Sequence, residues 1–376
     1  MSHVPRLLIP AAPVRVPRRR YASFRPTHLP RSMAALPLLG ALLWGPAAPV
    51  PAAAADAPYK IADRYKLGGE GGWDCLSVDA AGHRLFVSRA TRVVVVDLTT
   101  GKQAGEIQDT PGVHGIALAP DLGRGYTSNG RDSTVTVFDL KTLAPVARIH
   151  IGARNPDAIL YEPVTHRVFT FNGGSGSATA SDAAGDSVVG SVALGGRPEF
   201  GVADGKGRVY VNLEDSSAVV SFDARTLALG PRWPLAPGAN PSGLAIDPAR
   251  RVLFSACRNK RLVAMDADSG RVLADLPIGT GVDGVEFDAA KGLVLTSNGE
   301  GTLTVIQEDA GGKFKVLANV PTQRSARTLA LDPGTGRVYL AAAEMGPPSP
   351  PTKENPHPRP SMAAGSFTIL VLERQP

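Results

Sequence analysis

A unit of about forty residues repeats seven times between Trp73 and the C-terminus, and this periodicity restricts the possible folds more than any single motif does. The clearest copy, residues 241–279, contains four short apolar runs separated by turns rich in Asp, Gly and Pro. Runs of this length, rich in Val, Ile and Leu, are typical of β-strands, and no stretch beyond residue 60 keeps a helical period. The sequence therefore predicts an all-β protein made of four-stranded antiparallel repeats.

Four-stranded repeats of this length are typical of β-propeller blades, which form a ring around a central channel. The last repeat ends with a third strand at residues 367–372, and too little chain follows to form a fourth. Residues 59–67 have the pattern of an outermost strand that runs into a terminal glycine. We therefore predict a seven-bladed propeller whose ring is closed by this N-terminal strand. An open solenoid, the alternative, would leave exposed strand edges.

The first 57 residues have the features of a leader that is removed from the mature protein. They contain seven arginines, then an apolar segment at residues 33–44, then an alanine-rich stretch suited to cleavage. The alternative, a membrane anchor, is disfavoured because about a dozen apolar residues are too few to span a bilayer. We expect a periplasmic or secreted protein in which residues 58–376 form a single, monomeric propeller.

The charge of the remaining chain disfavours nucleic acid as a partner. The formal net charge is +6, but the seven leader arginines are accompanied by no acidic residue before Asp56. The rest of the chain is therefore close to neutral, and it has no excess of basic residues to bind a phosphate backbone. Cys75 and Cys257 lie in different repeats, so we expect free thiols rather than a disulfide.

The second strand of several repeats ends in a recurring tetrapeptide. It is YTSN at residues 126–129, FTFN at 169–172 and LTSN at 295–298, and third strands include TVTVFD at 134–139 and VVVVD at 93–97. These repeats resemble those of the YVTN-repeat, or YncE-like, family of secreted bacterial β-propellers. The resemblance implies the seven-bladed fold but no single reaction, because related propellers serve as binding platforms, lactonases, lyases and electron-transfer domains.

The first strand of each blade should flank the channel, so the residue at its start should recur around one mouth. All seven residues at this position are polar, namely Asp74, His114, Asp157, Glu199, Ser242, Asp283 and Arg327. The antiparallel second strand ends on the same face, which predicts a wider ring of ligand-binding residues: Arg89, Asn129, Asn172, Arg258 and Asn298. Trp73 is a candidate aromatic wall at the mouth, with packing between blades as the alternative.

Four carboxylates around one opening should repel one another. Two like charges about 8 Å apart repel by about 2 kcal/mol at an effective dielectric constant near 20. Compensation by Arg327 and His114, a raised carboxyl pKa, or a bound cation would relieve this repulsion. The carboxylates of Asp74, Asp157, Glu199 and Asp283 are candidate ligands for Ca²⁺ or another divalent cation.

Two functions fit this mouth. The favoured one is a non-enzymatic binding or scaffold protein that holds a protein, peptide, glycan or small molecule at the mouth and its loops. The alternative is a lactonase-like hydrolase in which a divalent cation polarises a carbonyl and His114 shuttles a proton.

A proline-rich insertion at about residues 344–365 interrupts the last repeat. Because proline lacks an N–H, we expect an extended loop that forms no ladder. Such a loop either leans over the mouth or is a solvated excursion.

Overall fold

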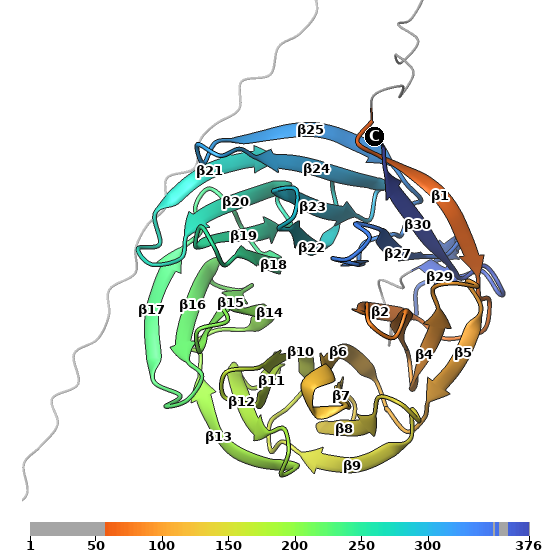
Figure 1. The fold of residues 1–376 in the computed structure, drawn as a ribbon, viewed down its shortest axis with the longest axis horizontal. Helices are drawn as coiled ribbons and strands as arrows, with labels where there is room; N and C mark the ends of the chain where they lie inside the picture. Colours follow the sequence, from red (N-terminus) through yellow and green to blue (C-terminus); the bar gives the residue numbers. More distant parts are fainter. Residues whose placement is uncertain (1–56, 349, 353–359, 376) are drawn as a thin grey trace, which may run out of the picture. The chain divides into compact units, whose positions relative to one another are not determined.

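The computed structural model describes residues 57–348, 350–352 and 360–375, which form a ring of seven four-stranded antiparallel sheets (Figure 1). The predicted all-β, seven-bladed propeller is therefore confirmed. The predicted leader, residues 1–57, lies outside the described residues except for Ala57. Within the described ranges, the single helical element is the short 3₁₀ turn η1 (Pro120–Leu122), and no helix has the length and apolar character needed to cross a membrane.

Each of the first six blades consists of four consecutive strands, counted from the channel outward. Blade one contains β2 (Trp73–Asp79), β3 (Arg84–Arg89), β4 (Arg92–Asp97) and β5 (Gln103–Ile107). Blade two contains β6 (Val113–Ala119), β7 (Arg124–Asn129), β8 (Thr134–Asp139) and β9 (Pro145–His150). Blade three contains β10 (Pro156–Glu162), β11 (Arg167–Asn172), β12 (Ser177–Asp182) and β13 (Ser187–Ala193).

The next three blades repeat this order. Blade four contains β14 (Pro198–Ala203), β15 (Arg208–Leu213), β16 (Ala218–Asp223) and β17 (Leu229–Pro234). Blade five contains β18 (Pro241–Asp247), β19 (Val252–Cys257), β20 (Arg261–Asp266) and β21 (Val272–Pro277). Blade six contains β22 (Val282–Asp288), β23 (Leu293–Asn298), β24 (Thr302–Glu308) and β25 (Phe314–Pro321).

Blade seven combines the two ends of the described chain. Its inner strands are β26 (Leu329–Leu331), β27 (Val338–Ala342) and β30 (Thr368–Arg374), and its outermost strand is β1 (Tyr59–Lys66). β1 pairs antiparallel with β30, with Tyr59 opposite Arg374 and Lys66 opposite Thr368. The N-terminal strand therefore closes the ring, as the sequence predicts.

The hydrophobic core is divided into seven clusters, each lying between two neighbouring blades of the described chain. For example, Phe169 and Phe171 of blade three pack against Val209 and Phe222 of blade four. Blades face one another through apolar side chains because each sheet buries both of its faces. Blade seven contributes to two clusters, which makes its completion by β1 important for both.

The proline-rich insertion differs from the extended loop without a ladder that the sequence predicts. Its base forms a short antiparallel ladder between β28 (Met345–Pro348) and β29 (Pro360–Met362), with Met345 opposite Met362. Proline is tolerated in β28 and β29 because each strand of a two-stranded ribbon has one unpaired edge. A missing N–H on that edge removes no hydrogen bond from the ladder. Residues 353–359 lie outside the described residues, and the described part of the insertion lines a separate cleft with Gln323 and Arg324.

Candidate functional site

A β-bulge at the start of the innermost strand positions the channel-facing residue in each of the first six blades. The pairing of β2 with β3 shifts register between Trp73 and Leu76, which places Asp74 in the bulge. The same shift brackets His114 in β6, Asp157 in β10 and the corresponding residues of β14, β18 and β22. A bulge turns a side chain away from the regular alternation of the strand. This local irregularity directs the polar residues to the axis.

Backbone contacts between blades hold several of these positions in place. The Ser128 hydroxyl donates to the Asp157 carbonyl, and the Ser297 hydroxyl donates to the Arg327 carbonyl at 2.5 Å. The Asn212 amide donates to the Ser242 carbonyl at 3.0 Å. The second strand of one blade therefore anchors the mouth residue of the next.

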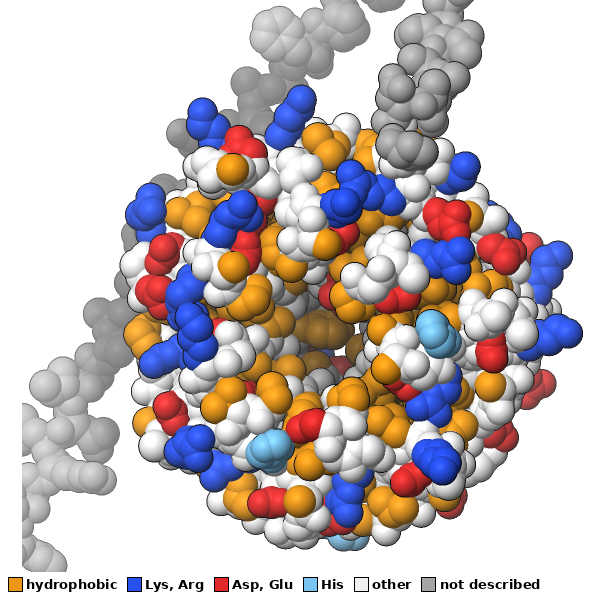
Figure 2. Space-filling view, viewed as in Figure 1, with side chains coloured by type: hydrophobic (Ala, Val, Ile, Leu, Met, Phe, Trp, Pro, Cys, Tyr) orange, Lys and Arg blue, Asp and Glu red, His pale blue; other side chains and the backbone are white. Residues whose placement is uncertain are grey.

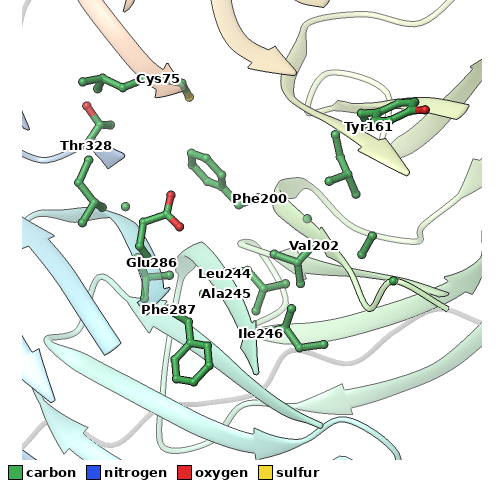
Figure 3. A pocket seen from close by; sticks show the side chains of 18 of the residues that line it. Cys75, Tyr161, Phe200, Val202, Leu244, Ala245, Ile246, Glu286, Phe287 and Thr328 are labelled. Carbon is green, nitrogen blue, oxygen red and sulfur yellow. The ribbon is translucent and has the colours of Figure 1, made fainter. Parts of the chain in front are cut away.

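The channel is hollow along the axis of the propeller, and hydrophobic side chains are visible deep within it (Figure 2). Two cavities share this channel. One, of about 650 Å³, is the polar mouth, lined by Asp74, His114, Asp157, Arg197, Glu199, Phe200, Arg258, residues 280–282, Asp283 and Arg327. The other, of about 470 Å³, is lined mainly by apolar side chains (Figure 3).

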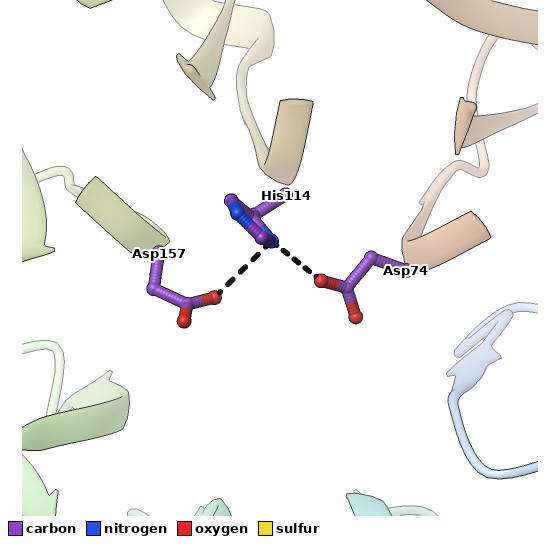
Figure 4. A group of neighbouring side chains, drawn as sticks. All are labelled: Asp74, His114 and Asp157. Carbon is purple, nitrogen blue, oxygen red and sulfur yellow. Dashed lines mark hydrogen bonds and ion pairs between the residues drawn. The ribbon is translucent and has the colours of Figure 1, made fainter. Parts of the chain in front are cut away.

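His114 lies between two aspartates from the neighbouring blades (Figure 4). Its Nδ1 atom is 2.7 Å from Asp74 Oδ2 and 3.6 Å from Asp157 Oδ1. The hydrogen bond with Asp74 raises the pKa of His114. One ligand atom from each of the three residues lies within 4.8 Å of the others, which is close enough for a metal ion. We call Asp74, His114 and Asp157 the histidine cluster.

Arg327 lies beside the histidine cluster, in the neighbouring blade seven. Its Nε donates to Asp283 Oδ2 at 2.8 Å, and its Nη2 lies 3.6 Å from Asp74 Oδ1. The Ser242 hydroxyl donates to the other oxygen of Asp283 at 2.6 Å. Arg327 therefore compensates two of the four predicted carboxylates, and Asp283 has a positive partner and a hydroxyl donor within the protein.

Glu199 belongs to a second charged group that sequence reasoning found only in part. Arg197 lies 3.7 Å from Glu199 and 3.3 Å from Glu214, and Arg258 lies 2.9 Å from Glu214. Arg258 was predicted for this face and lines the mouth, whereas Arg197 and Glu214 were not singled out. Arg197 could have been found as the residue two positions before the repeating mouth position, and Glu214 as the residue that follows β15.

Burial and repulsion by neighbouring carboxylates raise the pKa of two carboxyl groups at the mouth. Burial raises the pKa of Asp157 to about 6, and His114 opposes this shift. Burial and the nearby charges of Asp157 and Glu214 raise the pKa of Glu199 to about 8. A cation beside either residue would lower the pKa of its carboxyl group.

The predicted wider ring is largely wrong. Asn129, Asn172 and Asn298 are completely buried, and each amide donates to two hydroxyls at the start of the next strand, as Asn129 does to Thr134 and Thr136. The NH₂ group of each short amide side chain therefore finds its acceptors locally, within its own hairpin. These asparagines stabilise the blades and do not reach a ligand in the mouth.

Arg89 and Trp73 are also structural rather than exposed at the mouth. Arg89 is 1% exposed and lies 3.7 Å from the centroid of the Phe367 ring, while its guanidinium donates to carbonyls of residues 68, 70 and 71. Trp73 packs on Phe367 at 5.4 Å in the core between blades seven and one. The alternative of blade packing is therefore the correct one for Trp73. Cys75 and Cys257 are free thiols, as expected.

Sequence reasoning missed Glu286, which lies in the apolar cavity (Figure 3). Removal from water raises the pKa of Glu286 to about 7, and no other cause contributes. The residue occurs three positions after Asp283 in β22, where an acidic residue in an inner strand could have drawn attention.

Glu286→Gln should make unfolding less dependent on pH. Because the folded pKa lies above the unfolded value near 4.5, ionising Glu286 lowers the free energy of unfolding as pH rises from about 4.5 to 7, by up to about 3 kcal/mol. Above pH 7 the variant should therefore be more stable than the wild type, whereas the two should be similar at pH 4.5. Denaturant unfolding at several pH values checks this, and parallel curves for the two proteins would contradict it.

Comparisons with known proteins support the fold. No family model matches the chain, and no curated protein matches it. A solved chain of hydrazine synthase from Kuenenia stuttgartiensis is similar with a TM-score of 0.65 and 17% identity, covering 73% of this chain and 93% of that one. The WD40 repeats of RRP9 have a TM-score of 0.69 at 12% identity, covering 85% and 98% of the respective chains, and U3-55K has 0.68 at 12%, covering 84% and 98%.

Identities this low show a common fold and nothing about shared activity. The blade count, the strand order and these solved structures agree. The chain is a seven-bladed β-propeller with a WD40-like fold.

Proposed function

We propose that this propeller is a non-enzymatic binding protein whose mouth holds the cationic group of a ligand, such as an amine or a basic side chain of a peptide. The observation that carries this proposal is the charge balance at the mouth. The carboxyl groups of Asp74, Asp157, Glu199, Asp283 and Glu214 are accompanied by the guanidiniums of Arg197, Arg258 and Arg327 and by the imidazole of His114. A ligand cation would favour the ionised forms of Asp157 and Glu199, whose pKa values burial raises.

Asp157 is the best anchor for that cation. Its one ion-pair partner among the described residues is His114, at 3.6 Å, and that histidine lies closer to Asp74. A cation beside Asp157 would offset the cost of ionising this partly buried carboxylate. The bulged strands and inter-blade hydrogen bonds support this role because they hold the site in place before a ligand arrives.

Asp157→Asn should weaken the binding of a cationic probe. Hydrogen bonds to charged groups contribute about 1.5–3 kcal/mol, so we expect at least about tenfold weaker binding of spermidine. Titration calorimetry at pH 7.5 and low salt measures this. Glu70→Gln, which removes an exposed charge outside the mouth cavity, is the matched control and should bind like the wild type. Equal affinity of the Asp157 variant and the wild type would refute the proposal.

The histidine cluster favours a second candidate, a metal-dependent hydrolase of the lactonase type. Asp74, His114 and Asp157 would hold a divalent cation, which would polarise a carbonyl and lower the pKa of a bound water. Their two carboxylates and one imidazole fit such an ion, with positions left open for substrate. This set differs from the predicted ligands, because Glu199 and Asp283 are paired with arginines and His114 would be a ligand rather than a proton shuttle.

Metal analysis distinguishes the two candidates. The hydrolase requires a stoichiometric cation, a melting temperature that falls with chelator, and lactone hydrolysis that Asp74→Asn abolishes. The binding protein requires none of these, and its affinity for spermidine should survive chelation.

We also propose that the chain belongs among secreted YVTN-repeat propellers and reaches the periplasm or the exterior through its N-terminal leader. The buried asparagines that end β7, β11 and β23 support this, because they give the YTSN-type motif a structural reason within each blade. Cell fractionation followed by N-terminal sequencing of the mature protein tests it. A protein that retains Met1 and stays in the cytoplasm would contradict it.

A further inference from the structure

The apolar cavity below the mouth has a chemistry of its own. We call it the channel chamber, and its lining includes Phe200, Leu244, Val285, Glu286 and Phe287. Phe200 lines both the chamber and the mouth, so this residue of β14 lies where the polar and apolar parts of the channel meet. Figure 3 shows the Phe200 ring and the Glu286 carboxyl group both directed into the chamber.

Glu286 is the one acidic side chain among the residues that line the channel chamber, and no Lys, Arg or His lines it. Within the described part of the chain, its carboxyl group has no hydrogen bond or ion pair. The other polar groups that line the chamber either donate hydrogen bonds to other residues or are uncharged. The Thr328 hydroxyl donates to the Asp74 carbonyl at 2.8 Å, the Tyr161 hydroxyl donates to Asp121 at 2.7 Å, and burial raises the pKa of the Cys75 thiol.

An unpartnered carboxyl group in an apolar chamber is costly for the protein alone, because an ionised group that loses part of its hydration is stabilised by a counter-charge. Phenylalanine and leucine side chains around it offer the complementary surface for an apolar body, and aromatic rings also favour a nearby cation. The chamber volume of about 470 Å³ lies within the usual range for small-molecule sites. The unpaired carboxyl group and the apolar walls together favour a ligand with one positive charge and an apolar body.

We propose that the channel chamber binds a small hydrophobic primary amine, with its ammonium group on Glu286 and its apolar body against Phe200, Leu244 and Phe287. This site goes beyond the mouth proposed above and is independent of the histidine cluster. A hydrophobic alcohol would fill the same volume without supplying a charge. A polyamine would bring additional charges for which the lining has no acidic partner.

Binding should also release a proton at mildly acidic pH. The ammonium group pairs with the ionised carboxylate, so Glu286 must lose its proton when the amine binds below about pH 7. At pH 6 the wild type should therefore release close to one proton per bound amine. At pH 8, where Glu286 is mostly ionised already, the release should be small.

Calorimetry with 2-phenylethylamine tests the proposal, with 2-phenylethanol as the neutral match. The wild type should bind the amine at least about tenfold more tightly than the alcohol at pH 8, and Glu286→Gln should remove that preference. Glu70→Gln, outside both cavities, should leave amine binding unchanged. Titrations at pH 6 in two buffers of different ionisation enthalpy measure proton release, which Glu286→Gln should abolish.

A second variant keeps the test independent of Glu286. Ala203 lines the chamber, so Ala203→Phe should fill it and weaken the binding of both the amine and the alcohol. Equal affinity of the wild type for amine and alcohol would overturn the proposal, as would unchanged amine binding in Glu286→Gln. Loss of amine binding in Asp157→Asn but not in Glu286→Gln would place the amine at the mouth, which overturns the chamber site and leaves the proposed mouth function standing.

Discussion

A chain that begins at Leu67 instead of Ala57 should fail to give a cooperative unfolding transition. This deletion removes β1, which exposes the edge of β30 and uncovers two cores at once. Tyr59, which is fully buried, belongs to the core between blades six and seven, and Tyr65 belongs to the core between blades seven and one. Truncating a large buried aromatic side chain costs about 3–5 kcal/mol, so losing both approaches the total stability of a typical domain.

Circular dichroism melting and size-exclusion chromatography measure this result. We expect a broad transition and aggregation through the exposed strand edge. Tyr59→Ala should reproduce part of the loss, about 3–5 kcal/mol, because it also removes the hydrogen bond to the Gly336 carbonyl. Lys60→Ala, at an exposed position of the same strand, should change stability by less than about 0.5 kcal/mol. A sharp transition with an unchanged midpoint in the deletion would show that β1 does not close the ring.

Arg89→Met should destabilise the propeller by about 3 kcal/mol, the second largest effect that we expect. The guanidinium of Arg89 donates to the Gly68, Glu70 and Gly71 carbonyls at 3.3, 3.0 and 3.2 Å. These residues form the connection from β1 to β2, which joins blade seven to blade one. Burial lowers the pKa of Arg89 to about 10, so the side chain is still charged at neutral pH and its hydrogen bonds are charge-assisted.

Arg92 provides the matched control on the same hairpin. It shares the Glu70 carbonyl as an acceptor and pairs with Glu106 at 3.4 Å, but its side chain is 28% exposed. Arg92→Met should therefore cost less than about 1 kcal/mol. Arg89→Lys should be intermediate, because an ammonium group cannot form the same fork of hydrogen bonds. Equal losses for the two methionine variants in denaturant unfolding would refute the structural role of Arg89.

Side chains at the same position of different repeats have different surroundings in the structure, and the sequence does not predict these surroundings. Arg89, Asn129 and Arg258 all occur at or just after the end of a second strand. Asn129 bonds to the threonines of its own hairpin, Arg89 is covered by the loop at residues 68–71, and Arg258 stays exposed and pairs with Glu214. The backbone position recurs in each repeat, but the atoms that surround the side chain differ from one repeat to the next.

The repeats in the sequence determined the ring, its closure by residues 59–67 and the polar character of the mouth, because each repeat must place the same strand beside the axis. Only the tertiary structure decided which charges pair and which stay unpaired. Asp283 meets Arg327 and Asp74 meets His114, whereas Glu286 meets apolar side chains from other blades. Electrostatic energy depends on distance and solvation across blades, and residues far apart in the chain set both.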